Sequence, residues 1–310
     1  MSSPELAEWL GWPSGRIAQW ITDQGRPVVM GWPFNGTRRW YLIHRRENPE
    51  ANDYLTTIIR RQAELHRMVF VHGVGVIVAP GFGTELLTRG SAYTHYILGG
   101  LLQLADDAVY QEMFATGLQI RFYGDYEEVL NTPSLRPLLQ ACAQLTAATE
   151  SNEGPLLLIG LFADTPHQTL ARLSVEFAKR EGYPPNRQQL IEAYYGLAVP
   201  DLDLYLGFAQ PSLFDVPLLT TGEEDLYVTL APSPSLTEKQ LREILYDHLV
   251  TRPTAEISYE SLSHEAQEAL AEYNKRYSGA TLGIGRIDPL TGIWNPILPY
   301  PTTPMRYIES

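Results

Sequence analysis

The stretch VVMGWPFNGTRRWYL, residues 28–42, joins an apolar, beta-branched run to a glycine turn and two adjacent arginines. The run at 27–32 has the composition of a buried strand. Gly36 permits a backbone conformation that other residues avoid, and the pair Arg38 and Arg39 is suited to bidentate contacts with phosphate. The stretch therefore predicts a strand that ends in an anion-binding turn. Two solvated surface arginines are the alternative.

Six short apolar runs predict strands, at 27–32, 69–78, 118–123, 156–162, 202–208 and 226–230. Helical patterns lie between most of them, so the order of elements predicts an α/β fold with a mainly parallel central sheet flanked by helices. In such sheets ligands usually bind beyond the carboxyl ends of the strands, which is where the turn at Gly36 falls. Because no repeat or low-complexity linker divides the chain, residues 1–310 are predicted to form a single domain.

Three helices between and after these strands have recognisable patterns. The apolar residues of 52–68 keep to one face at the helical period. Tyr93 and Tyr96 share a face with the apolar residues of the following segment. Thr237 followed by Gln240 predicts a capping box at the start of a third helix.

The C-terminal segment, 253–310, departs from this alternation of strands and helices. It predicts a helix over 263–277, a hairpin around 288–292 and a proline-rich tail. We expect this extension to pack on the core or on a partner subunit.

Composition excludes several classes of function. The 310-residue chain has 23 Lys and Arg against 36 Asp and Glu, a net charge of −13, which argues against nucleic acid as a partner. Its longest apolar stretches, such as 154–162, fall short of the ~20 residues of a membrane span. The single cysteine, Cys142, excludes an internal disulfide, fits a cytoplasmic protein and is expected to be a buried thiol.

Common catalytic motifs are absent from the sequence. There is no G-x-S-x-G elbow, no phosphate-binding P-loop and no H-E-x-x-H motif. Asp106-Asp107 has Tyr110 where a metal-binding D-D-x-x-D motif needs a carboxylate, and the segment at 201–204 does not fit the D-x-D-D acid motif of terpene cyclases. Asp247-His248 is interpreted as part of a solvated helix face.

Four segments, read together and in order, resemble the cis-prenyltransferase superfamily over most of residues 25–250. FNGTRRWY (34–41) resembles its phosphate-binding turn D-G-N-R-R-W-A, and GFGTELLTR (81–89) resembles F-S-T-E-N-W-x-R. GLQIRFYGD (117–125) is similar to the strand that ends in I-G-D, and DLYVT (225–229) to E-L-Y-F-T. The resemblance implies the fold of undecaprenyl diphosphate synthases.

One departure from the family bears on function. Elongating members hold the diphosphate of the acceptor with an arginine-containing R-T-S-G-E-x-R-x-S segment, whereas the matching GFAQPSLFDVP (207–217) has no arginine. The second motif also changes, to Leu86 and Leu87. A chain that keeps the donor turn without an acceptor site is expected to ionise an allylic diphosphate without adding an isoprene unit.

The same departures are typical of a small branch that includes tuberculosinyl adenosine transferase and kolavelool synthase. PFNGTRRW (33–40), YGDYEEVL (123–130), IEAYYG (191–196), LREILYDH (241–248) and GIGRIDPLTGIW (283–294) resemble its signatures. The resemblance implies a bicyclic labdane- or clerodane-type diterpenyl diphosphate as substrate, and water or adenosine as nucleophile. It also implies a homodimer.

The resemblance further assigns roles around the turn. Gly36, Thr37, Arg38, Arg39 and Arg89 are expected to bind the diphosphate. Asn35 stands where the transferase of the branch has aspartate. Either the reaction does not need a carboxylate at this position, or Asn35 was introduced to trap substrate.

Aromatic residues are expected to line the cavity that receives the allylic cation, because ring faces attract cations. The candidates for the cavity wall are Phe34, Phe82 and Tyr96, and the candidate catalytic residues are Asn35, Tyr54 and Tyr93. Tyr54 matches an active-site tyrosine of the family, where it is expected to orient or deprotonate the nucleophile. Each of these tyrosines could instead be a core residue. Asp225 takes the place of the metal-binding glutamate of the elongating enzymes, so Mg²⁺ is an expected cofactor, although Asn35 weakens such a site.

Three functions remain open from the sequence. The first is a diterpene synthase in which water quenches the cation to give a tertiary alcohol. The second is a diterpenyl transferase to adenosine. The third is a non-catalytic subunit with this fold that supports a partner, against which the retained Gly36, Arg38 and Arg39 argue.

Overall fold

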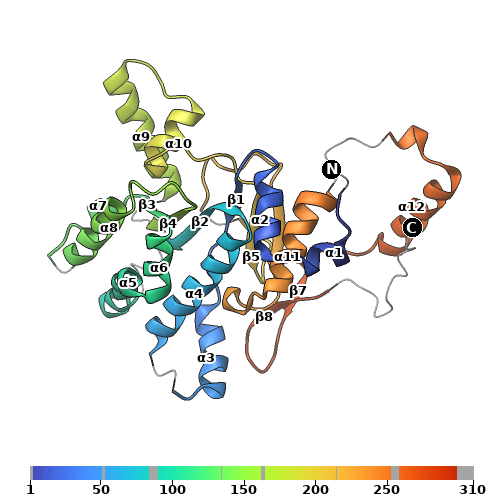
Figure 1. Cartoon of the computed structure of the whole chain (residues 1–310), viewed down its shortest axis with the longest axis horizontal. Helices are drawn as coiled ribbons and strands as arrows, with labels where there is room; N and C mark the ends of the chain where they lie inside the picture. The colour runs from blue at the N-terminus through green and yellow to red at the C-terminus, as the bar shows by residue number, and fades with distance from the viewer. Residues whose placement is uncertain are drawn as a thin grey trace.

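A six-stranded parallel sheet forms the centre of the computed structural model, which describes residues 3–50, 53–83, 90–133, 135–161, 165–213, 215–252 and 258–298 (Figure 1). The strand order is β3-β4-β2-β1-β5-β6, and each neighbouring pair is parallel. The strands are β1 (Val28–Gly31), β2 (Val74–Phe82), β3 (Gln119–Tyr123), β4 (Leu156–Leu161), β5 (Leu204–Phe208) and β6 (Asp225–Thr229). The predicted α/β fold is therefore confirmed.

Helices surround the sheet. They are α1 (Leu6–Gly11), α2 (Ser14–Thr22), α3 (Thr37–Glu47), α4 (Tyr54–Val71), α5 (Ser91–Asp106), α6 (Ala108–Ala115), α7 (Tyr126–Leu130), α8 (Arg136–Ala148), α9 (Pro166–Glu181), α10 (Arg187–Tyr195), α11 (Glu238–Tyr246) and α12 (His264–Tyr277). A 3₁₀ turn η2 (Ser233–Ser235) precedes α11, a π-helical turn η3 (Asp247–Thr251) follows it, and a 3₁₀ turn η4 (Tyr259–Ser261) precedes α12.

Successive strand residues belong to two different cores, as the pleat of a strand requires. Met30 joins the larger apolar cluster, which α1, α2, α4, α5, α6, α8 and α11 cover. Its neighbour Val29 joins the smaller cluster on the opposite face, which α10 and the segment 199–219 cover. A sheet buried on both faces explains why its strands are nearly continuous apolar runs.

One predicted boundary was wrong. The run at 69–78 was expected to be strand throughout, but α4 continues to Val71 and β2 begins only at Val74. The apolar residues that end α4 suit a buried helix face as well as a strand, so periodicity cannot separate the two. Gly73, with φ of 96°, makes the turn between them.

Local capping signals agree with the sequence. Thr237 and Gln240 form the predicted capping box at the start of α11.

Cys142 is buried, as predicted, and burial raises the pKa of its thiol to about 12. None of the helices in the described ranges is long and apolar enough to cross a bilayer.

The helix and the hairpin predicted for the C-terminal extension are present, and the part of its proline-rich tail beyond residue 298 lies outside the described residues. Its helix α12 contains no buried residue, and Figure 1 shows it standing away from the sheet. The antiparallel strands β7 (Gly285–Ile287) and β8 (Trp294–Pro296) form the hairpin. Near its base, a side chain on Gly283 would come within 2.9 Å of Pro211, so the extension reaches the segment that follows β5.

Candidate active site

The turn after β1 lies at the carboxyl edge of the sheet and is fixed by η2. Trp32 is fully buried, and its backbone N–H donates to the Val78 carbonyl over 2.8 Å. Asn35 is exposed, and its backbone N–H lies 2.9 Å from the Pro33 carbonyl and 3.1 Å from Ser233 Oγ. The Ser233 N–H in turn donates to the Asn35 carbonyl over 3.0 Å. Hydrogen bonds from a distant segment therefore hold the turn in place.

Gly36 is required at this turn by its backbone and by its surroundings. Its φ of 76° is in the left-handed region, which costs an L-residue with a side chain about 1–2 kcal/mol. A Cβ built on Gly36 would lie 2.7 Å from Phe208 Cε1 and 2.8 Å from Pro232 Cβ. Glycine therefore lets β5 and the segment before η2 close directly against the turn.

The first turn of α3 carries an unusual charge for a helix start. Gly36 is its N-cap and supplies no capping side chain, and Thr37, Arg38 and Arg39 follow with no acidic residue. Since the N-terminal end of a helix is electropositive, each exposed arginine there is disfavoured by about 0.3–1 kcal/mol. A bound anion would reverse this effect, because helix amides and guanidinium groups would then act on the same charge.

Three tyrosines meet beside this turn. The Tyr54 hydroxyl, on the first residue of α4, lies 2.7 Å from Thr37 Oγ1. Tyr41 packs edge-on against Tyr54 with a centroid separation of 5.1 Å. Tyr96 is 45% exposed, and the partial loss of its hydration, together with the nearby Asp53 and Tyr41, raises its pKa. The structure thus brings two predicted site residues, Tyr54 and Tyr96, to the same place as the turn.

Phe34 and Phe82 are half-buried and pack against the larger core cluster. Phe34 contacts Trp32 edge-on, with centroids 5.6 Å apart, and its centroid lies 6.4 Å from that of His66. Phe82 ends β2 at the carboxyl edge of the sheet. Phe34 therefore lies on the apolar side of the turn, and Phe82 packs on the same core cluster.

Other predicted residues cannot be placed. Arg89, Thr84 and Glu85, like Leu86 and Leu87, fall outside the described residues. Tyr93 lies on α5, and its side chain is likewise outside the part of the chain that the structure describes.

His66 is a buried neutral group behind Phe34. It is fully buried, Nδ1 lies 3.0 Å from the Tyr110 hydroxyl, and Nε2 has no hydrogen-bond partner. Burial lowers the pKa of His66 to about 3. The imidazole is therefore uncharged at neutral pH.

This histidine should make the fold sensitive to acid. The unfolded chain takes up a proton at His66 below pH ~6.5, whereas the folded chain does so only near pH 3. The folded state is therefore destabilised as the pH decreases from about 6.5 to 3. We expect this residue to lower the free energy of unfolding by about 2 kcal/mol between pH 7 and pH 5. Urea unfolding of the parent and of His66→Gln at both pH values measures it.

A matched control for this prediction is His264→Gln, whose side chain is 86% exposed and which should leave the pH dependence unchanged. Equal acid sensitivity of the parent and His66→Gln would contradict the assignment.

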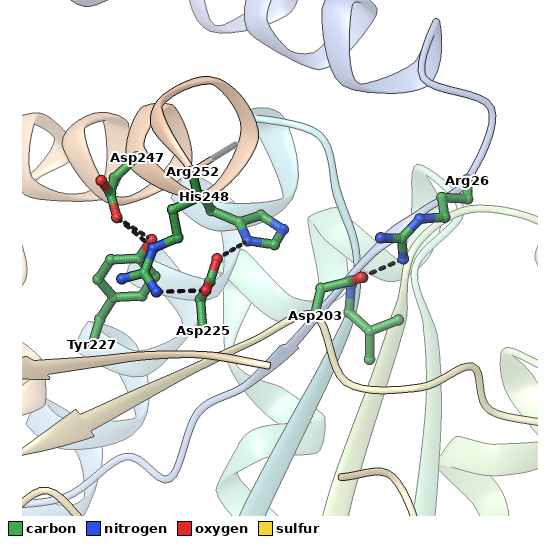
Figure 2. Close-up of polar contacts among 8 residues, drawn as sticks. Arg26, Asp203, Asp225, Tyr227, Asp247, His248 and Arg252 are labelled. Carbon is green, nitrogen blue, oxygen red and sulfur yellow. Dashed lines mark hydrogen bonds and ion pairs between the residues drawn. The ribbon is translucent and has the colours of Figure 1, made fainter. Parts of the chain in front are cut away.

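An ion-pair cluster joins the start of β6 to η3 (Figure 2). Asp225 receives His248 Nδ1 at 2.7 Å and Arg252 Nη1 at 2.6 Å. Asp247 accepts hydrogen bonds from the Tyr227 hydroxyl at 2.7 Å and Arg252 Nε at 2.9 Å. Although burial raises the pKa of Asp247, these hydrogen bonds lower it overall. The interpretation of Asp247-His248 as a solvated face was wrong, because both residues are bound to the sheet edge.

Asp225 is distant from the turn at Gly36 and is already paired within the ion-pair cluster. Asp225 pairs with Leu204, whereas the turn packs on Phe208, four residues further along β5 and thus about 13 Å away. Both carboxylate oxygens of Asp225 are already engaged. Within one chain, Asp225 and Asn35 therefore do not share a metal ion.

Mg²⁺ is usually bound by one or two carboxylates together with substrate phosphates and water, and residues 34–39 of the turn contain no carboxylate. Asn35 offers an amide. No group of three or more His, Cys, Asp or Glu side chains that could hold a metal occurs in the ranges that the structure describes. These residues thus do not fit a protein-held Mg²⁺ site.

Asp203, in the segment compared with the acid motif of terpene cyclases, has a structural role. One carboxylate oxygen accepts the backbone N–H of Val29 over 2.8 Å, and the other is paired with Arg26 (Figure 2). Asp203 therefore ties the start of β5 to β1.

The sequence did not identify Ser233, Pro232 and Phe208 as part of the site. Pro232 and Phe208 pack against Gly36, and Ser233 forms hydrogen bonds with Asn35. Their contacts with the turn join residues far apart in the chain, and no local pattern signals such contacts. The one available signal was that Phe208 ends the predicted strand at 202–208, at the same sheet edge as Gly36.

No family model matches the chain. Among characterised proteins it is similar to tuberculosinyl adenosine transferase of Mycobacterium tuberculosis, with 33% identity over 290 residues, 93% of this chain and 96% of the transferase. A shorter match, 34% identical over 112 residues, covers 36% of this chain and 37% of (+)-kolavelool synthase of Herpetosiphon aurantiacus.

Solved structures share the fold. A probable undecaprenyl diphosphate synthase from Campylobacter jejuni aligns with a TM-score of 0.56 at 14% identity, over 74% of this chain and 98% of its own. Lavandulyl diphosphate synthase from Lavandula x intermedia, in complex with dimethylallyl diphosphate, aligns with a TM-score of 0.57 at 12% identity. This alignment covers 72% of the present chain and 94% of the synthase. Together with the match over nearly its whole length, these likenesses show that the chain belongs to the family of tuberculosinyl adenosine transferase, the branch of the cis-prenyltransferase fold that also contains kolavelool synthase.

Proposed function

We propose that this protein releases diphosphate from a bicyclic, allylic diterpenyl diphosphate at the turn 35–39, and that water captures the cation to give a tertiary alcohol. The observation that carries the proposal is the pair of arginines in the first turn of α3, where the helix start disfavours cations and favours a bound anion. The names of both characterised relatives point to diterpenoid chemistry.

The leaving group is the part of the reaction that the turn can assist. As the C–O bond breaks, negative charge grows on the diphosphate, so donors fixed around it stabilise the transition state more than the bound substrate. Gly36 allows the backbone to approach closely, and the amides at the start of α3 are proposed to face the phosphate oxygens together with Arg38 and Arg39. Arg89 is proposed to complete this donor set.

The cation left behind needs a dry wall that attracts it without reacting. Phe34, Phe82 and Tyr96 are proposed to supply ring faces, each worth ~0.5–2 kcal/mol, and Tyr93 is proposed to extend this wall. Tyr54 is proposed to orient the nucleophile, because its hydroxyl is held by Thr37 at the edge of the diphosphate site. Asn35, exposed beside it, can donate and accept hydrogen bonds but cannot act as a base.

Transfer of the diterpenyl group to adenosine is the second candidate. It is supported by the similarity to the transferase, which spans 93% of this chain against 36% for the synthase. The third reading, a non-catalytic subunit, has less support because Gly36, Arg38 and Arg39 are all retained.

For each of these functions we propose a homodimer. Helix α12 has no buried residue within one chain, and we propose that it contacts the second copy.

The proposed function is tested by incubating the protein with labdane- and clerodane-type diphosphates, with and without adenosine and Mg²⁺, and analysing the organic extract by mass spectrometry. An alcohol formed without adenosine is the expected result. An adduct that forms only with adenosine would establish the second candidate instead, and no product under any condition would leave the non-catalytic reading. Asn35→Asp, assayed alongside, tests whether the amide limits turnover.

A further inference from the structure

Phe208 packs against the turn at Gly36. It ends β5 and is half-buried. A Cβ on Gly36 would lie 2.7 Å from Phe208 Cε1 and 3.1 Å from Phe208 Cδ1, so the ring edge contacts the glycine backbone directly. The ring therefore occupies the β5 side of the turn.

The Arg39 guanidinium stacks on the same ring. The Arg39 guanidinium carbon lies 5.0 Å from the ring centroid, within the range of a cation–π contact. An arginine side chain has many rotamers in water, and a stacked ring removes some of that freedom before a ligand binds. Phe208 thus restricts Arg39 to the end of α3 where the anion is proposed to bind.

The backbone after Phe208 holds the ring in position. The Ala209 N–H donates to the Thr229 carbonyl over 2.9 Å, and the Gln210 N–H donates to the Phe208 carbonyl over 2.8 Å. Ala209 has φ of 62°, a conformation that alanine adopts only when its surroundings enforce it. These contacts fix the backbone from which the Phe208 ring extends.

We infer that Phe208 is a positioning residue for the diphosphate site: it fixes the Arg39 guanidinium beside the departing group and fills the space next to Gly36. The ring is apolar, and residues 207–217 contain no Lys or Arg that could hold a second diphosphate. The inference rests on the proposed function, because it assigns Phe208 a part in the same site.

A double-mutant cycle with inorganic pyrophosphate as ligand tests this role. Dissociation constants are measured by calorimetry for the parent, Phe208→Leu, Arg39→Gln and the double variant. Phe208→Leu should weaken binding by about 2- to 10-fold, the value of a cation–π contact. The double variant should bind no more weakly than Arg39→Gln alone, because Phe208 acts through Arg39. Phe208→Tyr, which keeps the ring, should stay within about 2-fold of the parent.

The control cycle pairs Phe208→Leu with Tyr54→Phe, which removes the contact with Thr37 on another part of the turn, and should be additive. Additive losses in the Arg39 cycle, or a Phe208→Tyr variant as weak as Phe208→Leu, would overturn the positioning role. A parent chain that does not bind pyrophosphate would overturn the proposed function, and the inference with it. Thermal unfolding of each variant separates both outcomes from loss of the fold.

Discussion

Replacing both arginines of the turn, in the variant Arg38→Gln/Arg39→Gln, is expected to lower kcat/KM for diphosphate release by about 10²- to 10⁴-fold. The estimate counts one charge-assisted hydrogen bond per arginine, each worth about 1.5–3 kcal/mol. The loss should fall mainly on kcat, because the charge that the arginines meet grows toward the transition state. Release of pyrophosphate from the diterpenyl substrate, followed over time, measures it.

The fold of this variant should survive. Removing two positive charges from the start of α3 is favourable by about 0.3–1 kcal/mol each, which offsets the lost contact between Arg39 and Phe208. We therefore expect the free energy of unfolding without ligand to stay within about 1 kcal/mol of the parent value.

The same helix supplies a matched control, Arg45→Gln/Arg46→Gln, which removes the same charge from the last turn of α3. Cations there interact favourably with the helix end, so this control should lose about 0.3–1 kcal/mol of stability per arginine and keep its turnover. Equal turnover by the parent and the Arg38→Gln/Arg39→Gln variant would remove the basis for a diphosphate site at this turn.

The sheet was predictable because its strands are short apolar runs between Gly, Pro and Asp residues. The β1 strand and the turn at Gly36 follow from residues within one stretch, 28–42. The boundary between α4 and β2 was not predictable, since the apolar run that ends α4 suits both elements and only the conformation of Gly73 separates them.

The candidate site was predictable only where its residues are close in sequence or match a known motif. Gly36, Arg38 and Arg39 stood out from the sequence, and Tyr54 was found through the resemblance. Ser233 and Phe208 are far from the turn in sequence and reach it through tertiary contacts that no local pattern encodes.

The cluster around Asp225 illustrates the opposite error. Asp247 and His248 lie on an amphipathic helical pattern, and such charges are usually solvated. In the fold they meet Tyr227, Asp225 and Arg252 at the start of the last strand of the sheet. The partners of a charged residue depend on which strand forms the sheet edge, which helical periodicity does not reveal.

The absence of a second cationic site in residues 207–217 leads to the other large effect. Condensation with isopentenyl diphosphate requires that a second diphosphate be held near the first, and each missing charge-assisted contact costs about 1.5–3 kcal/mol. With neither arginine of the R-T-S-G-E-x-R-x-S segment present and the Phe208 ring against Gly36, we expect elongation to be slower than diphosphate release by about 10²- to 10⁴-fold. Elongation should therefore go undetected.

The most direct test of this account is one incubation of the protein with a diterpenyl diphosphate and an excess of isotopically labelled isopentenyl diphosphate. Released pyrophosphate and the mass of every organic product are measured together. The account predicts one pyrophosphate for each product molecule, a diterpenyl group with an unchanged carbon skeleton length, and no label in any product. Label in a product that is one isoprene unit longer would contradict it.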